Sequence, residues 1–299
     1  MYPISGGTMK KFIILALTVF LFYGCTLDNK HKNITLVTNS WIGYSPLFYA
    51  NEKGDLKKLG IKLIVSGSLG EASDIYSVGK ADMVSGTQHE YFWLKETTKD
   101  IYPFMLLDKS YGGDMILSNK NIRELKNSKK IYAYLEVNSV NNEILHYFLK
   151  KFSIKMNKIT FINKNQIKIQ ELRANPQKPV IIATYNPYDI VLKKHGFKVL
   201  ASTRDSSGLV VVDGLFAKIK ILKSDKKIVL ELKKVLDSSI DAIRKNPKKS
   251  YKLISGYLEN ISYKDFLNSL KKIKWINKPP KKLLSKLKKM GYSERYIIR

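Results

Sequence analysis

From Asn33 onward, short apolar runs rich in β-branched residues alternate with stretches whose apolar positions recur at helical spacing. The apolar runs predict strands at residues 34–37, 61–65, 82–85, 102–107, 130–134, 159–162 and 180–185. The amphipathic stretches predict helices at residues 47–53, 71–78, 140–152 and 188–195. Such alternation is typical of α/β proteins with largely parallel sheets.

After an extended apolar run at 209–218, the pattern turns helical to the end of the chain. The predicted helices span residues 225–246, 247–257, 262–275 and 280–290. This layout indicates two α/β lobes, with the chain crossing between them near Ser118 and near Ser206. We expect residues 33–118 and 207–299 in the first lobe and 119–206 in the second, with a small-ligand cleft between them.

The first residues have the pattern of an export signal. Lys10 and Lys11 precede an apolar run at 12–23, which Gly24 and Cys25 follow. The run is too short for a membrane-spanning helix of about 20 residues, and the stretch 21–25 resembles a bacterial lipobox. We expect a signal peptide at 1–24, beginning at Met1 or Met9, lipidation of Cys25, and a polar tether at 25–32, which would hold the protein at the periplasmic face of a bacterial membrane. A buried or chance cysteine is the alternative.

Lysine and arginine number 53 against 25 acidic residues, a formal net charge of +28. Such an excess raises the possibility of nucleic-acid binding. The basic residues are mostly lysines spread along the whole chain, however, whereas arginine is preferred for bidentate phosphate and base contacts. We therefore expect solvated lysine surfaces and no nucleic-acid partner; the lysine-rich stretch 271–289 could instead touch anionic lipid.

The usual catalytic and cofactor motifs do not occur. The sequence contains no GxGxxG, GxxxxGK[ST], HExxH or GxSxG. Its four histidines, at 31, 89, 146 and 195, lack metal-ligand spacing. We expect no enzyme activity, no metal and no cofactor.

Polar and aromatic loops follow several predicted strands, at 39–46, 86–90, 110–114, 138–141 and 185–188. Ligands of open α/β sheets bind just beyond the carboxyl ends of strands. Trp41 and Tyr44 offer flat apolar faces with polar groups, although Trp41 could simply pack between the lobes. Asp114 is either a turn residue or a carboxylate directed at an amine, and the helix that begins after Ser139 would favour an anion.

Four stretches carry a family resemblance: Trp41-Ile42-Gly43-Tyr44-Ser45-Pro46-Leu47, Gly79-Lys80-Ala81-Asp82, 108–114, and Ala183-Thr184-Tyr185-Asn186-Pro187-Tyr188. In order and spacing they resemble the SsuA/THI5-like periplasmic substrate-binding proteins of nitrate, sulfonate, taurine and thiamine-precursor ABC transporters. Asn186 stands where that family usually has a glutamate. The similarity runs from about Ile34 to Pro247.

The resemblance implies a type II periplasmic-binding-protein fold, whose two lobes close on a ligand by hinge motion. It also implies a monomer that delivers a small solute to an ABC permease and its ATPase. The residues it places around the cleft are Trp41, Tyr44, Thr87, Glu90, Asp114, Ser139, Asn186 and Tyr188.

The chemical class of the solute stays open at this point. Glu90 and Asp114 suit an amine or cationic heterocycle, whereas the helix after Ser139 suits an acidic group. A zwitterion or a thiamine-type pyrimidine would use both.

Two other functions are consistent with such a fold. A ligand-sensing module that partners a membrane signalling receptor would need the same cleft and anchor. An enzyme of pyrimidine-precursor synthesis is disfavoured by the export signal and by the lack of a histidine cluster or further cysteines.

Overall fold

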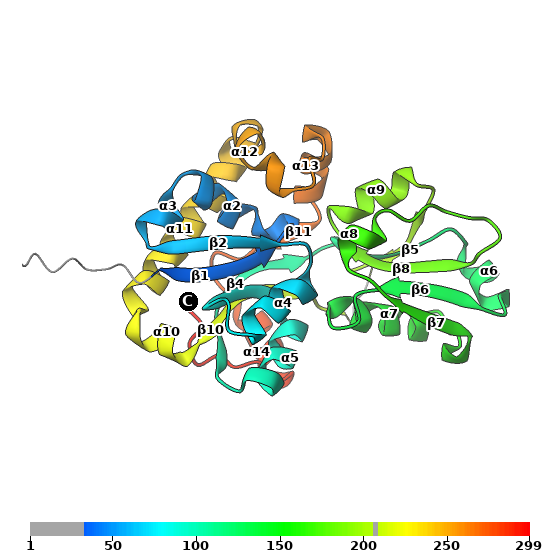
Figure 1. Ribbon diagram of the computed structural model, residues 1–299, viewed down its shortest axis with the longest axis horizontal. Helices are drawn as coiled ribbons and strands as arrows, with labels where there is room; N and C mark the ends of the chain where they lie inside the picture. Colours follow the sequence, from blue (N-terminus) through cyan, green and yellow to red (C-terminus); the bar gives the residue numbers. More distant parts are fainter. Residues whose placement is uncertain (1–32, 206–208) are drawn as a thin grey trace, which may run out of the picture. The chain divides into compact units, whose positions relative to one another are not determined.

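The strands form two separate sheets in the computed structural model, which describes residues 33–205 and 209–299 (Figure 1). The expected signal peptide, Cys25 and the tether lie outside the described residues, as does Ser206. None of the described helices is both long and apolar enough to cross a membrane.

The first sheet has six strands in the order β11-β4-β10-β3-β1-β2. Their bounds are β1 Ile34–Asn39, β2 Ile61–Ser66, β3 Met83–Thr87, β4 Ile101–Ser110, β10 Val212–Lys218 and β11 Ile273–Trp275. The strand β1 runs parallel to β2 and β3, whereas β10 is antiparallel to both β3 and β4. β1 is almost wholly buried, in keeping with a central strand covered on both faces.

The second sheet has five strands in the order β7-β6-β8-β5-β9. Their bounds are β5 Asp114–Ser118, β6 Ile131–Leu135, β7 Ile159–Asn163, β8 Val180–Tyr185 and β9 Lys198–Ser202. β6 is parallel to β7 and β8, and β5 is antiparallel to β8 and β9. Both sheets are thus mixed and not largely parallel, because the strands on either side of each crossing run against their neighbours.

Each sheet is covered by its own helices. Those of the first lobe, defined here as residues 33–110 and 212–299, are α2 Ser45–Glu52, α3 Asp55–Lys58, α4 Leu69–Ser77, α5 Gln88–Thr98, α10 Ile219–Ser224, α11 Lys226–Lys245, α12 Pro247–Ile254, α13 Tyr263–Leu270 and α14 Lys281–Lys289. Those of the second lobe, residues 114–202, are α6 Ile122–Asn127, α7 Val140–Lys151, α8 Gln166–Ile169 and α9 Tyr188–Lys194. The C-terminal helices α11 and α12 pack against α2, so the end of the chain returns to the first lobe.

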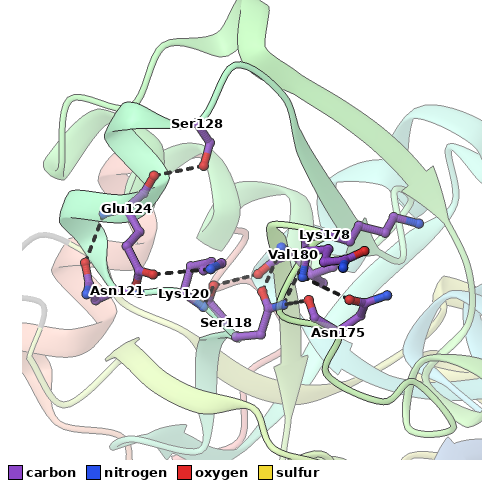
Figure 2. A network of polar contacts seen from close by, with 10 residues as sticks. Ser118, Lys120, Asn121, Glu124, Ser128, Asn175, Lys178 and Val180 are labelled. Carbon is purple, nitrogen blue, oxygen red and sulfur yellow. Dashed lines mark hydrogen bonds and ion pairs between the residues drawn. The ribbon is translucent and has the colours of Figure 1, made fainter.

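The first crossing comes before β5, not near Ser118. Asp114 is the register partner of Tyr185 in β8, and Ser118 that of Ile181, so the whole of β5 belongs to the second sheet. Ser118 lies inside a polar network of that lobe, where its hydroxyl donates to the carbonyl of Val180 at 2.6 Å (Figure 2). The crossing segment is therefore 111–113.

Helices and strands that the sequence pattern missed lie next to the cleft. The stretch expected as a loop at 86–90 contains the start of α5, because Thr87 caps the helix and Glu90 completes a capping box. The helix expected at 262–275 ends at Leu270, and its last residues form the edge strand β11 beside β4. Both differences bring backbone groups to the face between the lobes.

Candidate functional site

Aromatic side chains from both lobes meet where the carboxyl ends of β1 and β8 face each other. The ring of Trp41 lies edge-on to Tyr185, with 6.0 Å between centroids and 81° between planes. The hydroxyl of Tyr188 donates to the carbonyl of Gly67 in the first lobe at 2.8 Å, and Tyr185 accepts from the backbone N–H of Leu69 at 3.3 Å. All three rings are buried. Trp41 thus packs between the lobes and lies at the expected cleft.

Two buried carboxylates lie opposite each other beneath Trp41. Asp108 on β4 is the register partner of Asp213 on β10, and both are at most 2% exposed. The indole N–H of Trp41 reaches the two oxygens of Asp108 at 3.2 and 3.3 Å, and the hydroxyl of Tyr44 donates to Asp213 at 2.6 Å. Among the described residues, the side-chain donors to these carboxylates are therefore neutral.

A glycine makes the approach of Trp41 to Asp108 possible. A Cβ at Gly43 would lie 2.0 Å from Oδ2 of Asp108 and 2.3 Å from Nε1 of Trp41. The carbonyl of Gly43 also accepts a hydrogen bond from the indole N–H of Trp275 at 2.8 Å. A side chain at this position would push the tryptophan and the carboxylate apart.

Asp114 adds a third carboxylate from the second lobe. Its backbone N–H donates to the hydroxyl of Ser110 at 3.1 Å, and the side chain is 2% exposed. Its Oδ2 has no hydrogen-bond partner. Burial raises the pKa of Asp114 to about 7. The hydrogen bond with Ser110 works against this shift, and the charge of Glu90 adds to it. The residue expected to meet a ligand amine is thus buried and unsatisfied.

The three carboxylates of Asp108, Asp114 and Asp213 are named the acid cluster here. Burial raises the pKa of Asp108 to about 8, and it raises that of Asp213 well above its ordinary value, with the charges of Asp108 and Asp114 adding to the shift. None of the three carboxylates has an ion-pair partner among the described residues. An ionised carboxylate that loses its hydration without a counter-ion is strongly disfavoured. The acid cluster therefore favours neutralisation of its negative charge, by protons near neutral pH or by a cation.

Glu90 makes a different use of its carboxylate. One oxygen accepts from the backbone N–H of Thr87 at 2.9 Å and also contacts its hydroxyl, which closes the capping box of α5. The other oxygen accepts from the backbone N–H of Val140, the first residue of α7, at 2.8 Å. Glu90 thus joins the first lobe to a helix of the second lobe and is fully hydrogen-bonded.

Ser139 is the N-cap of α7, as expected. Its hydroxyl accepts from the backbone N–H of Asn141 at 3.2 Å and donates to the carbonyl of Glu136 at 2.9 Å. The positive end of α7 favours an anion. The carboxylate found there is that of Glu90, so Glu90 and Ser139 both accept from N–H groups at the start of α7, and Thr87 is bonded to Glu90.

An acidic groove opens between the lobes beside this contact. Its volume is about 430 Å³, and it is lined by Ser68, Gly70, Glu71, Asp74, Glu136, Asn138, Asn163, Lys164 and Asn165. Glu136 contacts the hydroxyl of Ser68 across the lobes, while its Oε2 has no partner. Burial raises the pKa of Glu136 to about 7. The groove therefore leads from solvent to a further under-satisfied carboxylate.

Amides near the cleft also have free hydrogen-bonding capacity. Asn186 donates from Nδ2 to Asp189 at 2.9 Å, but its Oδ1 has no partner although the side chain is fully buried. The Nδ2 of Asn39 and both amide atoms of Asn141 are likewise buried and unpartnered. Buried polar groups are normally satisfied, so these atoms have hydrogen-bonding capacity that the described side chains do not use.

A buried ion pair lies at the edge of the same contact. The ammonium of Lys272 in the first lobe lies 2.7 Å from Asp189 in the second, and Lys193 reaches the same carboxylate at 2.8 Å. Burial lowers the pKa of Lys272. These cations neutralise Asp189 and leave the acid cluster without a counter-ion.

Of the eight residues expected around the cleft, Trp41, Tyr44, Asp114, Asn186 and Tyr188 lie at the contact between the lobes, and Thr87, Glu90 and Ser139 form the hydrogen-bonded link beside it. Sequence reasoning missed Asp108, Asp213 and Glu136. A signal for the two aspartates exists, because Asp108 ends the apolar run Phe-Met-Leu-Leu and Asp213 interrupts the run Val-Val-Val-Asp-Gly-Leu-Phe. An acidic residue inside such a strand is expected to be buried, which makes it a candidate functional residue.

No metal site is evident in the described ranges. No group of three or more histidine, cysteine, aspartate or glutamate side chains there could hold a metal ion.

Two mixed α/β lobes that meet over buried, unsatisfied polar groups define a solute-binding protein of the periplasmic-binding fold. The chain belongs to the family described as NMT1/THI5 like, whose match covers residues 41–250. The solved structures that share its fold are described as binding proteins. The predictions of fold and family are confirmed. No curated protein sequence matches the chain.

Solved structures of ABC-type binding proteins share the fold. The alkanesulfonate-binding protein SsuA from Xanthomonas axonopodis pv. citri bound to MOPS gives a TM-score of 0.69 at 14% identity, covering 86% of this chain and 90% of that one. The aliphatic sulphonate-binding SsuA from Escherichia coli gives 0.67 at 13% identity, with coverages of 86% and 89%. The periplasmic nitrate-binding protein NrtA from Synechocystis PCC 6803 gives 0.63 at 12% identity, with coverages of 78% and 68%.

Proposed function

We propose that this protein is exported, anchored through a lipid on Cys25, and delivers a small polar solute to an ABC permease and its ATPase. The observation that carries the proposal is the set of buried polar atoms without partners at the contact between two lobes, since a solute would satisfy them. The candidate solutes at this level are amine-containing, sulfonate-like and thiamine-precursor-like compounds.

Binding would occur by closure of the lobes about the two crossing segments. Ser110 and Thr203 join these segments through a 2.7 Å contact between their hydroxyls, and the backbone N–H of Gly112 donates to Thr203 at 2.7 Å. Gly112 has a φ of +98°, a conformation that glycine adopts without a steric cost. Short segments of this kind suit a hinge, because they can absorb the change in backbone angles during opening.

The site would consist of Trp41, Tyr44, Asp114, Asn186 and Tyr188 of the expected residues, with Thr87, Glu90 and Ser139 as the link that holds the closed state. We propose that the protein acts as a monomer with lobe boundaries at 111–113 and in the segment 203–211. It would lie at the periplasmic face of a bacterial membrane.

Thermal unfolding with and without a solute panel tests the binding step. The panel spans sulfonates, nitrate, amino acids, polyamines and thiamine precursors. A ligand present at about 100 times its dissociation constant stabilises the protein by roughly 2.7 kcal/mol, which shifts the midpoint by several degrees. A cooperatively unfolding protein that responds to no member of the panel would contradict the solute-binding role.

The anchor and the transport role need separate tests. Metabolic labelling with a radioactive fatty acid should mark the parent protein and not the Cys25→Ser variant. A ligand-sensing module that partners a membrane signalling receptor is the second candidate. Genes for a permease and an ATPase beside this one favour transport, whereas a neighbouring receptor gene favours sensing.

A further inference from the structure

The acid cluster differs from an ordinary buried carboxylate site in having no counter-ion. Asp108, Asp114 and Asp213 come from β4, β5 and β10, so both lobes contribute to it. Among the described residues, the hydrogen-bond partners of their side chains are the indole of Trp41, the hydroxyl of Tyr44 and the hydroxyl of Ser110, all of them neutral. Three ionised carboxylates that repel one another in a closed interior destabilise the protein unless protons or a cation neutralise them.

A second observation points to a ligand at the acid cluster. Oδ2 of Asp114 is buried and has no partner, and the adjoining Asn186 presents a buried Oδ1 without a partner. Asp114 is the register partner of Tyr185, the residue before Asn186, and the Asn186 N–H donates to Gly113 at 2.9 Å. Two unsatisfied acceptors from neighbouring strands call for a ligand that donates hydrogen bonds.

The structure also disfavours an anionic ligand. The helix terminus that would attract one, at the start of α7, already receives the carboxylate of Glu90 at 2.8 Å. An anion brought beside the acid cluster would face three carboxylates at close range. The charge interactions that raise the pKa values of Asp114 and Asp213 include that of Glu90, so this acid also acts on the same space.

Aromatic rings complete the surroundings of the acid cluster. Trp41 contacts Asp108, Tyr44 contacts Asp213, and Tyr185 lies edge-on to Trp41. Carboxylates and aromatic faces together are the usual environment for an organic cation, through charge pairing and cation–π attraction.

We propose that the cleft binds a small organic cation with N–H donors, a primary ammonium or an amidinium, whose charge lies against Asp108, Asp114 and Asp213. The proposal rests on the proposed solute-binding function and narrows it to one ligand class. The acid cluster is closed off from solvent in this conformation, so the lobes must separate to admit the ligand.

The side chains that line the groove between the lobes also favour a cation. Glu71, Asp74 and Glu136 line it, against one cation, Lys164. The hydroxyl of Tyr185 accepts from the N–H of Leu69 at 3.3 Å, between Ser68 and Gly70 of the groove lining, so the groove adjoins the rings of the cleft. A cation entering by this route would meet negative side chains along its path.

Isothermal titration calorimetry of the purified protein at pH 8 tests the proposal. The N–H cations are putrescine, agmatine and benzamidine; choline is the cation without N–H donors, and methanesulfonate and nitrate are the anions. We expect saturable binding of at least one N–H cation, weaker binding of choline and none of the anions. Asp114→Asn should weaken the affinity by about tenfold or more, because a charge-assisted hydrogen bond is lost.

The control is Asp241→Asn, the same chemical change on the exposed face of α11, which should leave the affinity unchanged. Binding of methanesulfonate or nitrate would overturn the cation inference and leave the solute-binding function standing. Cation binding that Asp114→Asn does not weaken would overturn it as well. Failure of all three N–H cations overturns the inference, and the wider solute panel then decides the proposed function separately.

Discussion

Oε1 of Glu90 accepts a hydrogen bond from the backbone N–H of Val140 at 2.8 Å, so a side chain of the first lobe caps a helix of the second. The same carboxylate caps its own helix through Thr87. The charge stabilises the positive ends of α5 and α7 together. Because the two helices belong to different lobes, the contact at Val140 can exist only while the lobes are together.

Glu90→Gln should loosen the closed state more than it unfolds either lobe. The amide keeps the size of the side chain but removes its charge from two helix N-termini, and each such interaction is worth about 0.3–1 kcal/mol. We expect faster hydrogen exchange at Val140 and Asn141, with a decrease of about 1 kcal/mol in the free energy of unfolding. Glu96→Gln, on the exposed side of the same helix, serves as the control. Unaltered exchange at the start of α7 would show that Glu90 does not hold the lobes together.

Replacing one carboxylate of the acid cluster by its amide should stabilise the ligand-free protein. Asp114→Asn removes a buried charge that has no counter-ion and keeps the shape of the side chain. At pH 8 the free energy of unfolding should increase by about 1–3 kcal/mol, because the parent must either desolvate a carboxylate or hold a proton there. Denaturant titration of both proteins measures the difference. If Asp114 served only to stabilise the fold, Asp114→Asn would decrease the free energy of unfolding instead.

The stability of the ligand-free protein should decrease as the pH rises from about 4 to 8. Burial raises the pKa of Asp114 from 3.8 to about 7 and that of Asp108 from 3.8 to about 8. The folded state therefore binds more protons than the unfolded chain between these values, and the free energy of unfolding falls as pH increases through that window. Below it both states are protonated, and above it both are ionised, so these groups add no further slope.

Other groups titrate in the same range, among them His89, so the measurement compares variants. The gain in stability of Asp114→Asn over the parent should grow from about pH 4 to about pH 7 and then level off. With Asp241→Asn the difference should stay flat, since its carboxylate is exposed. A gain that is constant over the whole range would mean that the pKa of Asp114 is not raised by folding.

Local sequence signals predicted the parts of the fold that depend on local chemistry. The apolar run at 180–185 and the cap at Ser139 define β8 and the start of α7 at the expected residues. Thr87 and Glu90 were expected in a loop and instead cap a helix, a local capping-box signal that was not recognised. The stretch at 273–275, by contrast, forms a strand because the distant strand β4 offers it an edge.

In the acid cluster, too, one residue has a local sequence signal and the other two depend on long-range strand pairing. Asp114 follows two glycines and was identified as a candidate, whereas Asp108 and Asp213 lie inside apolar runs and become neighbours only through the register of β4 with β10. A pairing over such a distance in sequence leaves no local periodicity. Glu90 was expected to face a ligand, and only the docking of α7 shows that its carboxylate is already bound.

Gly43→Ala should disrupt the cleft although it removes no hydrogen-bonding side chain. The new Cβ would lie 2.0 Å from Asp108 Oδ2 and 2.3 Å from Trp41 Nε1, so the tryptophan and the carboxylate must separate. Overpacking of a buried site costs about 1–3 kcal/mol, and here it also breaks the contact that positions Trp41. We expect that loss of stability together with loss of solute binding, followed by thermal unfolding and calorimetry. Gly256→Ala is the matched control, because nothing lies within 4 Å of its added Cβ. Solute binding that survives in Gly43→Ala would show that the Trp41–Asp108 contact is not part of the binding site.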